Sequence, residues 1–186
     1  MTWSSAPAWR TARSSAVNRP FSGSQPNADI WLDPTEPPVN QDAADTILDA
    51  GVFVIGPGSL YTSVMPNRVV PGISDALQRS RAIRLFGANV AIWPGEPDGF
   101  DAVQHHRAAC EYIGDDVVEF VLVNNNHAGT LPTEWQPAAV LTSETDDFGS
   151  TQLVMDNLLH AEDPYHHDSD RLADLVIRTA IRAHAG

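Results

Sequence analysis

Short runs of apolar residues alternate along the chain with segments whose apolar positions recur at helical spacing. The strongest runs are Val52–Ile55, 82–86 and 117–123. A continuous apolar run of this length is typical of a strand covered on both faces, as in a parallel sheet. Helices are predicted over 40–50, 60–65, 73–80 and 101–112, and from about residue 168 onward. This alternation predicts an α/β protein with a Rossmann-like, open and mainly parallel sheet, flanked by helices in three layers.

The beginning of the chain differs from the rest. Residues 1–27 are rich in Ser, Ala and Arg and show little periodicity, so we expect them to be disordered or poorly packed. A short strand is predicted at 30–32, ending before Pro34, and two more at 138–141 and 152–155. We therefore expect residues 28–186 to form a single domain.

The turn after the first strong strand is the best candidate for chemistry. Gly56-Pro57-Gly58-Ser59 leads directly into a predicted helix with Ser59 as its N-cap. Unpaired N–H groups and the dipole at a helix N-terminus favour an anion such as phosphate, and Thr62 and Ser63 add hydroxyl donors. A tight structural turn explains the same glycines, so both interpretations stay open.

Two later polar loops follow strands of the same predicted sheet. The segment 94–99 presents Glu96 and Asp98 between glycines and prolines, either to bind a metal, a ribose hydroxyl or a substrate proton, or as a solvated turn. Asn124 and Asn125 end the next strand, where they would contact a base or sugar or stabilise the turn. Ligands of open α/β sheets bind outside the carboxyl ends of the strands, so the three loops predict one site.

The charge and composition narrow the classes of partner. The formal net charge is −13, and all 11 basic residues are arginines. This balance argues against a nucleic-acid surface and an anionic membrane surface. With one cysteine, Cys110, which we expect to be a buried apolar residue, and scattered histidines, we predict no zinc site. No apolar run is long enough to span a bilayer, so we expect a soluble cytoplasmic protein.

His105 and His106 lie in a predicted helix. Adjacent helical positions do not share a face, so the two side chains cannot chelate one metal together. We expect one to point towards the loop cluster and the other to be exposed. Asp168 is predicted to be the N-cap of the last helix.

Four segments together resemble the CofD-like superfamily, in particular its gluconeogenesis-factor (YvcK-like) branch. The resemblance rests on the run from Gly56 to Asn67 followed by Val70-Pro71-Gly72-Ile73; on Asn89-Val90, Pro94-Gly95-Glu96 and Asp98-Gly99-Phe100 with His105; on Val123-Asn124-Asn125; and on His167-Asp168 with Leu172-Ala173. It extends from about residue 30 to about residue 181. Ala91, Ile92, Trp93 and Pro97 depart from the family pattern, and nothing in residues 1–26 resembles its glycine-rich N-terminal loop.

The resemblance implies a Rossmann-like, cytoplasmic protein. In the gluconeogenesis-factor branch it implies binding of a UDP-sugar and regulation of carbon metabolism, cell-wall precursor supply and cell shape. In the other branch it implies a magnesium-dependent 2-phospho-L-lactate transferase acting on a deazaflavin. A third hypothesis is a truncated or split subunit that needs a partner supplying the N-terminal half, or that forms a homodimer.

The candidate site residues fall into two groups. The phosphate- or nucleotide-binding candidates are Gly56, Pro57, Gly58, Ser59, Leu60, Thr62, Ser63 and Asn67. The candidates near the sugar or base are Asn89, Gly95, Glu96, Asp98, Gly99, His105, Asn124 and Asn125. No catalytic residue is assigned, and Mg²⁺ is expected only for the transferase hypothesis.

Overall fold

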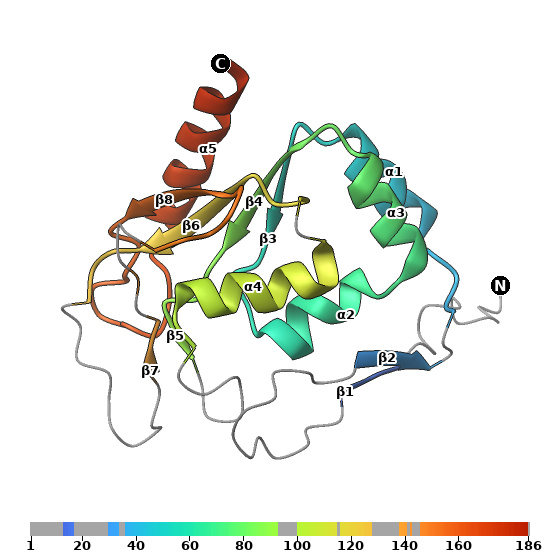
Figure 1. Cartoon of the computed structure of the whole chain (residues 1–186), viewed down its shortest axis with the longest axis horizontal. Helices are drawn as coiled ribbons and strands as arrows, with labels where there is room; N and C mark the ends of the chain where they lie inside the picture. Colours follow the sequence, from blue (N-terminus) through green and yellow to red (C-terminus); the bar gives the residue numbers. More distant parts are fainter. Residues whose placement is uncertain are drawn as a thin grey trace, which may run out of the picture.

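A computed structural model describes residues 13–16, 30–33, 36–92, 100–114, 116–127, 138–140, 142 and 146–185. Its centre is a four-stranded sheet in the order β3-β4-β6-β8 (Figure 1). The strands are β3 (Val52–Ile55), β4 (Ile83–Gly87), β6 (Phe120–Asn124) and β8 (Gln152–Asp156). All three pairings are parallel, so the predicted open parallel α/β sheet is confirmed.

The helices begin and end where the local sequence supplies caps. α1 (Gln41–Asp49) starts at Asn40, whose side chain accepts from Ala43 N. α4 (Ala102–Ile113) starts with a capping box between Asp101 and Gln104 and ends before Gly114. α5 (Ser169–Ala185) follows Asp168, whose Oδ1 accepts from Arg171 N at 3.1 Å, so the predicted N-cap is confirmed.

Proline residues shape the helices after β3. A π-helical segment, η2 (Leu60–Val64), continues directly into α2 (Met65–Arg68), with Pro66 in the first turn of α2. The helix predicted over 60–65 is therefore longer, and Pro66 marks a change of winding because it has no N–H to donate. α3 (Pro71–Arg79) begins two residues earlier than predicted, since proline is well suited to the first helical position.

The helices form layers on both faces of the sheet (Figure 1). On one face α5 packs its Leu175 and Ala180 against Leu85 and Leu122 of the sheet. On the other face α4, η2 and α2 enclose the main core around Phe86, Val121 and Met65, which are at most 2% exposed. α1 and α3 pack together through Ile47 and Leu77. This arrangement confirms the predicted three layers.

Several predicted boundaries shift. The strand predicted over 117–123 begins only at Phe120, because Val117 N donates to Gly114 O in a turn after α4. The strand predicted at 138–141 is the short β7 (Ala138–Ala139), antiparallel to β5 (Ala91–Ile92). Within the segment 1–27, β1 (Arg13–Ala16) pairs antiparallel with β2 (Ile30–Asp33). The other residues of that segment lie outside the described residues, so the expectation for them stays a prediction.

Candidate functional site

The turn after β3 passes close over the end of β4. Gly56 adopts φ +75°, and a Cβ there would lie 3.0 Å from Gly87 O. A Cβ on Gly87 would in turn lie 3.1 Å from Pro57 Cδ. Glycine is favoured at both positions because a side chain would crowd the neighbouring backbone, and at Gly56 also because of its positive φ. The turn and the end of β4 therefore form one closely packed unit.

Asn89 joins the first predicted loop to the second. Its Oδ1 accepts from Gly58 N at 2.9 Å, and its Nδ2 donates to Gly58 O at 3.2 Å. The side chain of Asn89, which follows β4, thus bonds both the backbone N–H and the backbone C=O of Gly58. The two loops meet at the carboxyl edge of the sheet as predicted, and Asn89 braces the turn.

Several of the side chains predicted to bind phosphate do not face the helix start after the turn. Ser59 occupies the N-cap position, and its carbonyl accepts from Ser63 N and Val64 N at 2.9 and 3.1 Å, but its side chain forms no cap hydrogen bond. Leu60 is 1% exposed in the core, so only its backbone can meet a ligand. Asn67 Nδ2 donates back to Ser63 O at 2.7 Å. The side chain of Thr62 lies outside the described residues.

Asn124 is almost fully buried and connects the ends of β6 and β8. Its Oδ1 accepts from Leu158 N at 3.0 Å and Asn126 N at 3.3 Å, while its Nδ2 donates to Asn126 O at 2.7 Å. Asn125 N donates to the carbonyl of Asp156 at 3.0 Å. The amide of Asn124 is therefore hydrogen-bonded to the protein backbone, as expected if it stabilises the turn. Contact of either asparagine with a sugar or base stays a prediction.

The prediction for the two histidines of α4 was wrong in one respect: both are buried. His105 is 1% exposed and lies edge-on to Phe86, with ring centroids 6.0 Å apart. Burial lowers the pKa of His105 to about 4, so its ring is neutral at pH 7. His106 packs edge-on against Phe86 and Phe148, because the α4 face that carries it also covers the sheet. Neither side chain faces solvent.

His167 is a residue of this region that the motif analysis did not assign to the site. It precedes α5, and its Nε2 lies 3.1 Å from Ala88 O, where it is placed to donate a hydrogen bond. Burial lowers the pKa of His167 below its usual value, an effect opposed by the bond to Ala88. The signals in the sequence were its position beside the cap residue Asp168 and its place in the segment that carries the family resemblance. It brings a fourth segment to the carboxyl edge near Asn89.

Four predicted site residues, Gly95, Glu96, Asp98 and Gly99, lie outside the described residues. In the part of the chain that the structure describes, no three His, Cys, Asp or Glu side chains are grouped to hold a metal ion. Cys110 is buried as predicted, with Sγ 3.4 Å from His106 Nε2.

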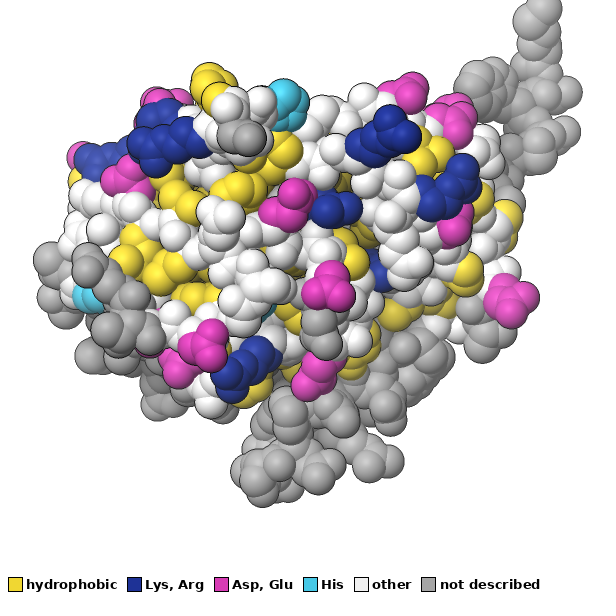
Figure 2. Space-filling view, turned by 45° about the horizontal axis from the view of Figure 1, so that its top comes forward, with side chains coloured by type: hydrophobic (Ala, Val, Ile, Leu, Met, Phe, Trp, Pro, Cys, Tyr) yellow, Lys and Arg dark blue, Asp and Glu magenta, His cyan; other side chains and the backbone are white. Residues whose placement is uncertain are grey.

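Charged side chains of both signs are mixed on the surface. On the face seen in Figure 2, arginine and acidic side chains are interspersed rather than gathered in a basic stripe. Such a stripe is the usual mark of a nucleic-acid-binding surface. Of the helices that the structure describes, none combines the length and apolar character that crossing a bilayer requires.

Comparison with known proteins identifies close relatives. The chain is 31% identical over 155 residues to a putative gluconeogenesis factor of Aquifex aeolicus, and 28% identical over 157 residues to the gluconeogenesis factor of Bacillus subtilis. Each alignment covers 80% of this chain but only 47% and 49% of the relative, so the chain spans about half the length of these proteins.

The fold has solved counterparts. A crystal structure of a protein from Bacillus halodurans matches 80% of this chain and 50% of its own, with a TM-score of 0.67 and 29% identity. The family described as 2-phospho-L-lactate transferase CofD matches residues 11–174. From the glycine turn to the last helix, the chain therefore belongs to the CofD family.

Proposed function

We propose that this chain binds a nucleotide-activated sugar, with the diphosphate at the turn between β3 and η2. The observation that carries the proposal is the paired hydrogen bond of Asn89 with Gly58, which fixes the helix start beside the second loop. Donors held rigidly in advance cost little further ordering when an anion binds. The ligand would then extend along the carboxyl edge towards Asn124, as ligands of open α/β sheets do.

The chemistry of the chain suits such a phosphate site. Because the sequence has no lysine, arginine is the only permanently charged side chain that can contact an anion, and backbone N–H groups and hydroxyls can supply the other donors. The first N–H groups of a helix have no partner within the helix and point at the turn that precedes it. Ser59 precedes the first turn of η2 and Ser63 follows it, so both hydroxyls lie close in sequence to these N–H groups.

The relatives suggest the role that this binding serves. Several are named gluconeogenesis factors. On this basis we propose that the chain acts in the cytoplasm as a regulator of carbon metabolism that responds to a cell-wall precursor and thereby affects cell shape. Such a role needs binding without turnover.

Calorimetry with UDP-N-acetylglucosamine tests the binding. We expect saturable one-site binding to the wild type and a loss of about tenfold or more in affinity for Asn89→Ala, because the turn loses its brace. Gly51→Ala is a matched control, since a Cβ there meets nothing within 4 Å. The absence of heat with folded protein at millimolar ligand would remove the proposal.

The family description favours a second candidate, a magnesium-dependent transferase of the 2-phospho-L-lactate type. In this case Glu96 or Asp98 would hold Mg²⁺ and neutralise phosphate charge. Incubation with a nucleotide-activated phospholactate and a deazaflavin should then release nucleoside monophosphate. Release that requires both Mg²⁺ and the deazaflavin would decide for the enzyme, and ligand binding without release would decide for the regulator.

A further inference from the structure

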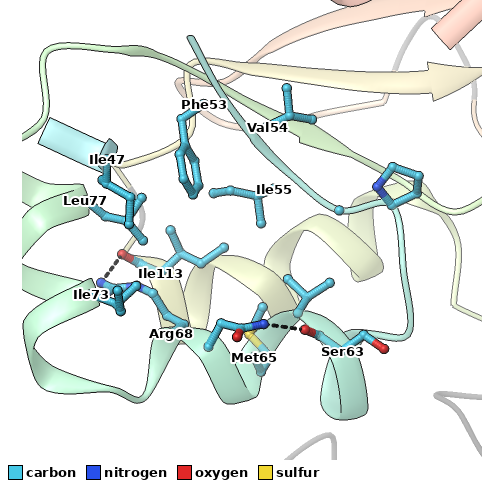
Figure 3. Close-up of a pocket in the computed structure, with 14 residues that line it drawn as sticks. Ile47, Phe53, Val54, Ile55, Ser63, Met65, Arg68, Ile73, Leu77 and Ile113 are labelled. Carbon is cyan, nitrogen blue, oxygen red and sulfur yellow. Dashed lines mark hydrogen bonds between the residues drawn. The ribbon is translucent and has the colours of Figure 1, made fainter. Parts of the chain in front are cut away.

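A cavity of about 420 Å³ lies between β3 and the helices that pack beside it (Figure 3). Its walls are largely apolar. They come from β3 and the turn after it, from α1, η2, α2 and α3, and from the end of α4. The apolar part includes Phe53, Ile55, Ile47, Ile73, Leu77 and Ile113, and Gly56, Ser63 and Asn67 also line the cavity. A concave, apolar space of this size with few polar groups is typical of small-molecule sites.

The cavity opens along an unpaired strand edge. β3 pairs with β4 alone among the described strands. Ile83 N donates to Gly51 O, and hydrogen bonds to a given neighbour alternate along a parallel strand, so Val52 and Val54 direct their backbone groups to the open side. Val54 is 37% exposed there. A ligand can therefore enter from this edge.

One charged side chain lines the cavity. Arg68 of α2 runs between Ile73 and Ile113 and is only 7% exposed (Figure 3). Its Nη2 donates to Ile113 O at 2.8 Å. Its Nε and Nη1 are buried and have no hydrogen-bond partner, and no ion pair of the described residues includes it. Burial lowers the pKa of this guanidinium from its usual value, although an arginine stays charged at neutral pH.

A buried guanidinium with unused donors favours an anion. Isolated charges are costly to remove from water unless they are paired and hydrogen-bonded. The planar guanidinium matches a carboxylate, whose two oxygens can accept from adjacent N–H groups. The walls suit an apolar body attached to that carboxylate.

We propose that this cavity binds a small organic monocarboxylate with an apolar body, its carboxylate paired with Arg68 and its chain lying between Phe53, Ile73 and Leu77. The cavity shares Gly56, Pro57, Ser63 and Asn67 with the proposed phosphate-binding segment, but Arg68 is not among the residues proposed to hold the phosphate. A polypeptide strand added to β3 is the other occupant to consider. Such a strand would form hydrogen bonds with the backbone groups of Val52 and Val54. It would pair with Arg68 only if it carried an acidic side chain at one position. The unpaired guanidinium therefore favours the small acid.

Calorimetric titration with octanoate and octan-1-ol tests the proposal. We expect octanoate to bind the wild type at one site, and octan-1-ol to bind about tenfold more weakly or worse, because it lacks the charge. Arg68→Met should weaken octanoate binding by about tenfold or more, while Arg79→Met, the same change at an exposed helical arginine, should leave it unchanged. Ile73→Trp, which fills the cavity and keeps Arg68, should also abolish binding.

Two further measurements keep the outcomes distinct. Circular dichroism checks that each variant is folded, and sedimentation reports whether a second copy of the chain is bound. No octanoate binding to the folded wild type, or equal binding to Arg68→Met, would overturn the proposal. A second result would also overturn it: sedimentation shows a dimer of the wild type, Arg68→Met is a monomer, and octanoate does not change the wild-type dimer. A second copy of the chain would then occupy the cavity.

Discussion

Asn89 holds Gly58 by two hydrogen bonds, one to its N–H at 2.9 Å and one from the asparagine amide to its C=O at 3.2 Å. The two residues are 31 positions apart and follow adjacent parallel strands. The pair converts a flexible glycine turn into a fixed one. A single asparagine thereby connects the stability of the fold with the shape of the proposed site.

Replacing Asn89 should measure that connection. We expect Asn89→Ala to lower the free energy of unfolding by about 1–2 kcal/mol, because a part-buried backbone pair loses both partners. Asn89→Asp keeps an acceptor for Gly58 N but places an anion beside Gly58 O. Its free energy of unfolding should therefore be no higher than that of Asn89→Ala. Urea denaturation gives both values. Stability equal to the wild type would contradict the bracing role.

A side chain at Gly87 should destabilise the fold. A Cβ would lie 3.1 Å from Pro57 Cδ and 3.2 Å from Pro57 N, and the backbone of the turn would have to shift. We expect Gly87→Ala to cost about 1–3 kcal/mol in thermal or urea unfolding, as overpacking does. Gly51→Ala, with open space around its Cβ, is the control and should change stability little. Equal effects of the two substitutions would show that the close approach is unimportant.

His105 should make the fold sensitive to mild acid. Its pKa is lowered by burial to about 4, against an ordinary value near 6.5, so between these values the unfolded chain binds the proton and the folded chain does not. The free energy of unfolding should therefore fall as pH decreases from about 6.5 towards 4. The full effect is on the order of 3 kcal/mol for this shift.

The matched variant is His105→Phe, which keeps an aromatic ring beside Phe86. Urea denaturation at several pH values should show a flatter pH dependence for this variant than for the wild type. His167, whose pKa is also lowered by burial, contributes in the same direction and remains in the variant. Identical profiles would contradict the assignment to His105.

Asp156 should link β8 to α5 through Arg178, which also pairs with Asp174. The hydrogen bond from Arg178 is the main cause that lowers the pKa of Asp156, followed by the N–H of Asn157. A lowered carboxyl pKa gives stability that is present above the unfolded value, near 4, and is lost as pH falls through the folded value.

Substitution tests this pair against a simpler one. Because both partners are about 40% exposed, we expect Asp156→Asn to cost less than about 1 kcal/mol at neutral pH, and less in high salt. The cost should shrink below pH 4. Asp75→Asn, which breaks the more exposed pair with Arg79, should cost less. A cost for Asp156→Asn that is unchanged in acid would contradict the ionic contribution.

Local sequence predicted the features that depend on neighbouring residues. The run Val52–Ile55 is a strand with the bounds expected, Asp101 with Gln104 starts α4, and Asp168 starts α5. Apolar period and cap chemistry act within one or two turns of chain, so they can be read without the fold. The family resemblance, carried by the same loops, was also confirmed.

Side-chain environment was predicted less well. One of His105 and His106 was expected to be exposed, yet both are buried, and Leu60 was named as a binding residue yet lies in the core. Helical periodicity shows which residues share one face of a helix. It does not show how much of the helix surface the sheet and the neighbouring helices cover. Arg68 gave no signal at all, since an arginine near a helix end is usually solvated.

The sequence by itself determined the alternation of strands and helices, the positions of their caps and the glycine turn after Ile55. Tertiary structure alone decided the strand order β3-β4-β6-β8, the pairing of Asn89 with Gly58 and the burial of Arg68 beside Ile113. The physical reason is the sequence separation of the contacts. Hydrogen bonding and capping within a segment depend on adjacent residues, whereas contacts between residues 31 or 45 positions apart form only when the strands and helices have packed together.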